Sequence, residues 1–185
     1  DADPWTLPGF ASLAEGTHTI WFRVKDDAGN WNAGTYGWQF YKDTVAPQPP
    51  TGFVALPGNN KTHLRWTNPT GDPTFYGIEI RFKRWNGYPH YAPPAPGYPA
   101  DHTQGTLAAI LGGEVHDDTP RAPRDIYYYA AFSRDRAGNY SPLGTTAFDR
   151  CTSYWLGDAI ADGLVNVSDL AAFSATYGRL EGQPG

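Results

Sequence analysis

The sequence predicts an all-β protein, made of short strands joined by tight turns and packed as β-sandwich modules. Its 185 residues include 21 Gly and 17 Pro, while 15 % are aromatic and only 18 % are charged. Many turn formers together with many aromatic side chains are typical of short packed strands. They argue against a helical bundle and against a Rossmann-type enzyme. A duplicated turn motif that follows two alternating strands supports the same fold class.

The turn motif Asp-x-Ala-Gly-Asn, followed by an aromatic residue, occurs in segments 23–31 and 132–140, at an offset of 109 residues. Its glycines, Gly29 and Gly138, can adopt a positive φ, and its first Asp can accept hydrogen bonds from the turn's own amides. Each copy follows a strand with apolar residues at every second position: Ile20, Phe22 and Val24 before the first copy, and Tyr127, Tyr129 and Ala131 before the second. We interpret each copy as the hairpin between the last two strands of a β-sandwich.

These hairpins resemble those of bacterial extracellular immunoglobulin-like and fibronectin type III repeats, and segment 43–47, Asp-Thr-Val-Ala-Pro, resembles the seam between such repeats. Segment 50–83 resembles strands A, B and C of a fibronectin type III domain. In that resemblance, Trp66 belongs to the core of strand B, and Ile78 and Ile80 belong to the core of strand C. The resemblance implies the C-terminal part of an immunoglobulin-like repeat at 1–46 and a complete fibronectin III-like sandwich at 47–150.

The N-terminal segment is expected to lack part of its sandwich. Strands near 17–26 and 36–42 carry an apolar face. A sandwich needs about seven strands to close its core, so a few strands alone leave that face exposed to water. Either the preceding part was cut away, or a neighbouring molecule covers the face through strand exchange. The expected interface residues are Trp5, Ile20, Phe22, Val24 and Phe40, with Trp21 as a contact residue on the opposite strand face.

A Pro-rich aromatic insertion, residues 85–99, follows the predicted strand C. Because Pro cannot donate to a strand ladder, we expect an extended edge segment with polyproline II character rather than a central strand. Three roles are open for its aromatic side chains: covering the sandwich edge, binding a protein or stacking on a glycan. The side chains concerned are Trp85, Tyr88, Tyr91 and Tyr98.

The C-terminal segment 151–185 contains a 12-residue EF-hand-type loop followed by a short helix expected at 168–178, with Ser168 as its cap. Ca²⁺ binds oxygens at alternating loop positions, which predicts as ligands Asp158, Asp162, the carbonyl of Leu164, Asn166 and Asp169. Ile160 offers no side-chain oxygen and weakens the site; the alternative is a degenerate loop without metal. The segment resembles one half of a dockerin, the module that docks secreted proteins onto cohesins. A dockerin has two such segments, so a cohesin-like partner is not expected.

Charge and hydropathy limit the partners. The net charge is −5 and no basic run occurs, so nucleic acid is not an expected partner. No apolar stretch approaches the roughly 18 residues of a membrane-spanning helix. The chain contains no Met, so we expect a mature or excised piece of a longer protein.

No catalytic constellation emerges from the sequence. The five His are scattered, and the single Cys151 has no His nearby in the sequence. A strand-face position is expected for His18 and His63, and a turn before the Tyr-rich strand for Asp117 and Asp118.

We therefore expect a non-catalytic, extracellular or cell-surface protein that spaces and docks modules. Its partners would be other protein modules, among them copies of itself that assemble into a fibre through the incomplete repeat. The alternative is an accessory region, for adhesion or glycan binding, of a large secreted hydrolase.

Overall fold

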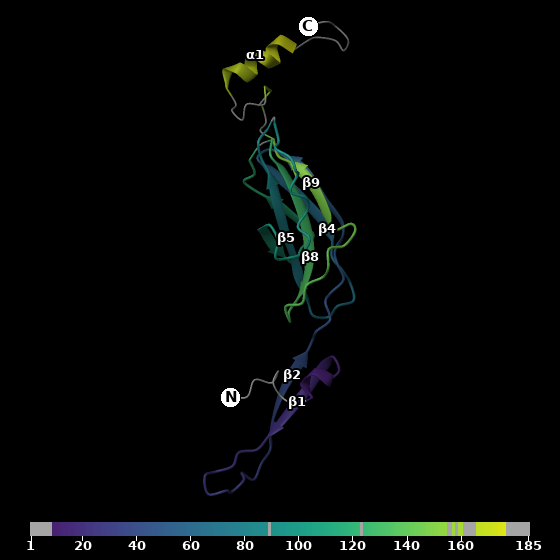
Figure 1. Ribbon diagram of the computed structural model, residues 1–185, viewed down its shortest axis with the longest axis vertical. Helices are drawn as coiled ribbons and strands as arrows, with labels where there is room; N and C mark the ends of the chain where they lie inside the picture. Colours follow the sequence, from purple (N-terminus) through teal and green to yellow (C-terminus); the bar gives the residue numbers. More distant parts are fainter. Residues whose placement is uncertain are drawn as a thin grey trace. The chain divides into compact units, whose positions relative to one another are not determined.

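The computed structural model describes residues 9–176 apart from 89, 123, 155–156, 158 and 161–165. The chain divides into two compact units, residues 1–45 and 46–185. Figure 1 shows a two-stranded hairpin in the first unit, and a strand-rich body followed by one short helix in the second. Because the strands of the second unit form two sheets around one core, the predicted all-β sandwich is confirmed.

The first unit is a hairpin preceded by a short 3-10 turn at Phe10–Ser12. Strand β1 (Gly16–Phe22) pairs antiparallel with β2 (Tyr36–Lys42), so that Phe22 lies opposite Tyr36 and Gly16 lies opposite Lys42. Beyond the strands, the bridge between Lys25 and Trp31 continues the pairing up to the predicted turn. The continuous ladder of β1 therefore ends at Phe22, before the end of the strand predicted at 17–26.

The second unit contains a three-stranded and a four-stranded antiparallel sheet in its described residues. The first sheet has the order β3 (Thr51–Gly58), β4 (Lys61–Thr67) and β7 (Val115–Asp118). The second has the order β6 (Thr106–Leu111), β5 (Phe75–Trp85), β8 (Ile126–Asp135) and β9 (Phe148–Thr152). Helix α1 (Val167–Thr176) follows in the C-terminal segment.

The core lies between these two sheets. Both contribute alternate residues of their strands, as the period of two along a strand requires. Trp66 is 4 % exposed and Ile78 and Ile80 are fully buried, so all three predicted core residues lie inside. The core cluster comprises Phe53, Ala55, Leu64, Trp66, Ile78, Ile80, Phe82, Tyr127, Tyr129, Ala131 and Cys151.

The two copies of the turn motif adopt the same hydrogen-bonded structure. In the first copy, the N–H of Asp26 donates to the carbonyl of Asn30 (2.9 Å), and the N–H of Asn30 donates to Oδ1 of Asp26 (2.8 Å). Asp135 and Asn139 repeat both bonds, at 3.2 and 2.8 Å. The amide of Asn30 holds the pKa of the Asp26 carboxyl below its usual range. The glycine of each copy has a φ of +92°, which explains why the motif requires Gly there.

The prediction of a turn at Asp117 and Asp118 is wrong, because both residues belong to strand β7. Asp118 faces the core and is 3 % exposed. It accepts a hydrogen bond from the hydroxyl of Tyr129 (2.8 Å) and forms an ion pair with Arg121, whose Nε lies 2.6 Å from Oδ2. Burial and the neighbouring carboxylate raise the pKa of Tyr129. These contacts fix the connection from β7 to β8 in place.

Truncating a buried core side chain should lower the free energy of unfolding more than truncating an exposed side chain. Leu64 is fully buried, so Leu64→Ala should lower the free energy of unfolding by about 2–5 kcal/mol. Val115, on the same sheet, is 62 % exposed, and Val115→Ala should change it by less than about 0.5 kcal/mol. Urea unfolding followed by tryptophan fluorescence measures both; equal losses would contradict the sandwich core.

Candidate interaction surfaces

The β1–β2 hairpin carries an aromatic face, defined here as His18, Ile20, Phe22, Tyr36, Trp38 and Phe40. These residues face each other in pairs across the two strands, and residues directly opposite lie on the same side of a sheet. Their rings pack along the face: the centroids of Phe22 and Tyr36 are 5.7 Å apart, and those of Trp38 and Phe40 are 5.9 Å apart. The hairpin thus presents one continuous apolar surface.

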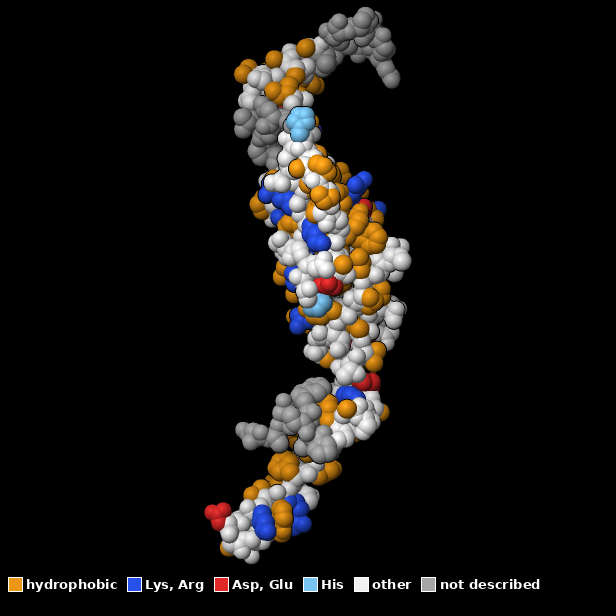
Figure 2. Space-filling view, viewed as in Figure 1, with side chains coloured by type: hydrophobic (Ala, Val, Ile, Leu, Met, Phe, Trp, Pro, Cys, Tyr) orange, Lys and Arg blue, Asp and Glu red, His pale blue; other side chains and the backbone are white. Residues whose placement is uncertain are grey.

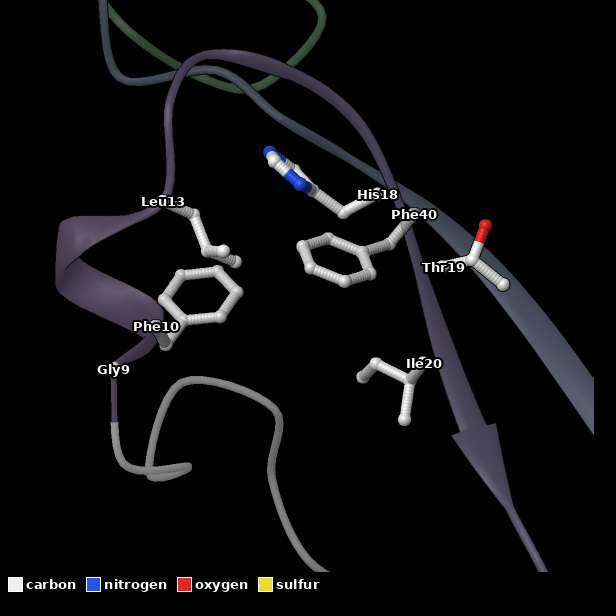
Figure 3. Close-up of a pocket in the computed structure, with 7 residues that line it drawn as sticks. All are labelled: Gly9, Phe10, Leu13, His18, Thr19, Ile20 and Phe40. Carbon is white, nitrogen blue, oxygen red and sulfur yellow. The ribbon is translucent and has the colours of Figure 1, made fainter.

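Only one end of the aromatic face is covered by described residues. Phe10, from the 3-10 turn, stacks on Phe40 at 5.5 Å and is 7 % exposed. Figure 3 shows Phe10 and Leu13 on one side of a pocket and Phe40, His18 and Ile20 on the other. Nε2 of His18 lies 2.7 Å from the carbonyl of Ala14, which ties the loop before β1 to this end of the face.

The described residues leave the rest of the aromatic face open. Phe22 is 49 % exposed, Trp38 52 % and Tyr36 54 %. Figure 2 shows hydrophobic side chains at the surface of this hairpin. Of the predicted interface residues, Ile20, Phe22 and Phe40 lie on this face, Val24 is exposed just beyond β1, and Trp5 lies outside the described residues. Sequence reasoning missed Tyr36 and Trp38, although their alternation with Phe40 was visible.

Trp21 lies on the opposite side of the hairpin, as predicted from the alternation, and is 68 % exposed. Its ring extends across the strand over Gly37, where an added Cβ would come within 3.0 Å of the indole. Because Gly37 has no side chain, the indole of Trp21 can lie directly against the backbone of β2.

The Pro-rich aromatic segment lies against a sheet face and not along a sheet edge. Tyr128 points away from the core, yet it is only 4 % exposed because the ring of Tyr98 packs on it at 5.3 Å. Tyr98 also contacts Phe148 at 4.6 Å, and its carbonyl accepts a hydrogen bond from Nζ of Lys83. The insertion thus forms a cover for the outer face of the four-stranded sheet.

The other aromatic residues of this segment make internal contacts as well. Nε1 of Trp85 donates to the carbonyl of Ala92 (2.9 Å), and the hydroxyl of Tyr91 donates to the carbonyl of Arg124. The rings of Trp85 and Tyr91 are 5.0 Å apart. Tyr88 is the most exposed of the four predicted interface residues, at 44 %.

Two of the five predicted calcium ligands lie in the described part of the C-terminal segment. Asp169 is 3 % exposed, and its two oxygens accept the N–H groups of Ile160 (3.2 Å) and Asn166 (2.9 Å). Those amides lower the pKa of the Asp169 carboxyl. Oδ1 of Asn166 accepts the N–H of Ser168 (2.8 Å), so Asn166, rather than the predicted Ser168, caps helix α1. Asp158, Asp162 and Leu164 lie outside the described residues.

The described residues contain no group of three or more His, Cys, Asp or Glu side chains that could hold a metal ion. Within the same residues, no helix is both long and apolar enough to cross a membrane. Cys151 lies in the sandwich core, where its thiol contacts the carbonyl of Thr152. Burial raises the pKa of this thiol to about 11, so it is protonated at neutral pH.

Neither a protein-family model nor a curated protein matches the sequence. An Fn3-like protein from Clostridium thermocellum is 19 % identical, with 60 % of this chain and 98 % of that chain covered and a TM-score of 0.41. The human fibronectin type III domain containing protein 3 contains a domain that is 11 % identical, with 65 % and 97 % covered and a TM-score of 0.39.

A β-1,2-glucanase from Parabacteroides distasonis is 15 % identical, with 69 % of this chain but only 16 % of the glucanase covered and a TM-score of 0.41. The sandwich is assigned from the three-stranded and four-stranded sheets themselves.

The thiol of Cys151 should be unreactive in the folded protein. With its pKa near 11, its thiolate fraction at pH 8 is about 100-fold smaller than that of an unfolded cysteine. The rate of reaction with the disulfide reagent DTNB should therefore rise at least about 100-fold when the protein is unfolded in urea. Similar rates in the two states would place the thiol at the surface.

Proposed function

We propose that the chain is a non-catalytic extracellular module that spaces and joins other protein modules, and that it associates through the aromatic face of its N-terminal hairpin. A second copy of the chain is one such partner. The observation that carries the proposal is the open face itself: Phe22, Tyr36 and Trp38 are each about half exposed on one continuous surface. Exposed contiguous apolar patches of this kind are typical of protein interaction sites.

A hairpin that is not covered by another layer has only marginal stability in water. Two isolated strands are barely stable in water, whereas further strands or a packed layer stabilise them. Burying apolar surface contributes roughly 25 cal/mol per Å², so covering several half-exposed aromatic side chains favours association. Tyr, Trp and Phe are also the residues enriched at the centres of protein interfaces.

Self-association should depend on this face and not on exposed aromatic residues in general. Trp38→Ser should raise the dissociation constant by at least about 30-fold, the effect of losing about 2 kcal/mol at a central aromatic residue. Tyr41 is equally exposed, at 54 %, but lies on the opposite side, so Tyr41→Ser is the matched control. Light scattering coupled to size exclusion, over a range of protein concentrations, measures both.

A chain that stays monomeric at every concentration would contradict self-association. That result would favour the alternative function, an adhesion or glycan-binding region appended to a secreted hydrolase. Such an appendage would be inert alone, or would respond in its tryptophan fluorescence to polysaccharide through Trp85.

We also propose that the loop from Asp158 to Asp169 binds Ca²⁺, with Asp158, Asp162, the Leu164 carbonyl, Asn166 and Asp169 as ligands. The pattern of oxygen donors around Gly163 supports this site, and Ile160 removes one donor from it. Calcium sites of extracellular modules have dissociation constants of about 10⁻⁴–10⁻³ M. The extracellular setting that we propose would therefore suffice to fill a weakened loop.

Calorimetric titration with CaCl₂ should show binding in this range, and Asp158→Ala combined with Asp162→Ala should abolish it because two carboxylates are lost. Asp27→Asn, in an exposed turn of the other unit, removes one carboxylate and should leave binding intact. Undiminished binding by the double variant would remove the loop as the site.

A further inference from the structure

We infer that the edge of β1 opposite to β2, which pairs with no described residue and is called the free edge below, is a receptor for one added antiparallel strand with large apolar side chains at alternate positions, like β5 of the second unit. The inference rests on the proposed function, because it specifies how the N-terminal hairpin would receive its partner. The internal duplication supports it, because the complete sandwich shows which strand pairs with β8, the equivalent of β1.

The two units match beyond the turn motif. At the same offset of 109 residues, Val24 corresponds to Ser133 and Asn32 corresponds to Ser141. The N–H of Val24 donates to Oδ1 of Asn32 (2.8 Å), and the N–H of Ser133 donates to Oγ of Ser141 (3.0 Å). In return, the N–H of Asn32 and that of Ser141 donate to the carbonyl of Val24 and that of Ser133, both at 2.9 Å. The two hairpins thus share their closing bonds.

The side chains at the corresponding positions His18 and Tyr127 both contact the loop that precedes the strand, although through different backbone groups. Nε2 of His18 lies 2.7 Å from the carbonyl of Ala14, and the hydroxyl of Tyr127 accepts the N–H of Ala122 at 2.9 Å. The correspondence between β1 and β8 therefore rests on the shared turn and not on the loops before the strands.

The apolar positions also coincide. Ile20 corresponds to Tyr129, which is fully buried, and Phe22 corresponds to Ala131, which is fully buried. In the second unit these positions belong to the core between two sheets, whereas Phe22 in the first unit is half exposed. The aromatic face of the hairpin is thus the counterpart of a core face.

In the second unit, β8 has a neighbour on each edge, with β9 on one side and β5 on the other. Phe82 of β5 lies opposite Tyr129, and Ile80 lies opposite Ala131. In the first unit, β1 pairs with β2 in place of β9, and no described residue pairs with its other edge. By this correspondence, the incoming strand places a Phe82-like side chain opposite Ile20 and an Ile80-like side chain opposite Phe22.

The backbone groups of β1 fit such an addition. The N–H and carbonyl of Val24 bond toward the β2 side of the hairpin, at Asn32. Because successive residues of a strand direct these groups to opposite edges, those of Thr19 and Trp21 point to the free edge. Unpaired backbone groups at a sheet edge are the usual acceptors of an added strand.

The test uses the full chain and a fluorescent peptide with the sequence of residues 77–85, Gly-Ile-Glu-Ile-Arg-Phe-Lys-Arg-Trp. Fluorescence anisotropy measures its binding. A control peptide carries Ser in place of both Ile and the Phe but keeps every charge, so that attraction of a basic peptide to an acidic chain is subtracted. We expect the control to bind at least about 10-fold more weakly.

Two comparisons assign the binding to the edge of β1. In the protein, Ile20→Lys should weaken binding at least about 10-fold, whereas Thr17→Lys, on the opposite strand face, should leave it unchanged. In the peptide, N-methylation of the Arg81 amide should abolish binding, whereas N-methylation of the Phe82 amide should spare it. The difference follows from the direction of the backbone groups in the second unit. The N–H of Ala131 donates to the carbonyl of Ala147 on the β9 side, so the backbone groups of Ala130 point toward β5. Arg81 lies opposite Ala130, so its amide belongs to the ladder with β8, whereas that of Phe82 points away.

The methylated peptides act on the unaltered protein, so the test holds even if Ile20→Lys disturbs the hairpin. Equal binding of both methylated peptides, or binding of the Ser control as tight as that of the parent peptide, would overturn strand addition. Self-association of the chain without such binding would overturn this inference but not the proposed function. Peptide binding by a strictly monomeric chain would overturn self-association alone.

Discussion

An apolar sheet face is stable in water only when a second layer covers it, and the architecture of this chain follows from that constraint. In the second unit, the inner faces of the two sheets cover each other, with Leu64 and Trp66 on one side and Ile80 and Tyr129 on the other. In the first unit, the 3-10 turn at Phe10–Ser12 covers one end of the aromatic face, and no other described segment covers the remainder. The same requirement that builds the sandwich underlies our proposal that the hairpin associates through this face.

The four-stranded sheet also requires a cover on its outer face, because its strands β5 and β8 bury residues on both faces. Glu79 and Tyr128 point outward but are 2 % and 4 % exposed. The insertion after β5 covers Tyr128 through Tyr98, whereas Glu79 is bonded to Arg81 and to the hydroxyl of Tyr140. The prolines of the insertion suit its position because a segment lying on a face does not need ladder hydrogen bonds. The aromatic residues that looked available for a partner are thereby engaged mainly within the molecule, Tyr98 with Tyr128 and Phe148 most directly.

Much of the fold could be predicted from local pattern. The period of two before each turn motif placed Ile20 and Phe22 on one face and Tyr127 and Tyr129 on another, and the requirement for Gly with positive φ placed both turns. The aromatic face was predicted only in part, since Tyr36 and Trp38 were overlooked in the second strand. The role of Asp118 could not be predicted, because the pairing of β7 with β4 turns its side chain toward the core and the packing of β8 brings the Tyr129 hydroxyl to it.

The sequence by itself determined the fold class, the two hairpins, the core positions of Trp66, Ile78 and Ile80, and the existence of an uncovered apolar face at the N-terminal unit. The fold class, the hairpins and the apolar face depend on residues close together in the chain, whose periodicity and turn chemistry are visible without coordinates. The three core positions follow from the resemblance of segment 50–83 to strands A, B and C of a fibronectin type III domain. Only the tertiary structure decided which face the Pro-rich insertion covers, that Asp117 and Asp118 end a strand, and that His18 contacts the loop that precedes it. Those outcomes depend on the docking of strands far apart in sequence and on loop backbone geometry, for which no local pattern exists.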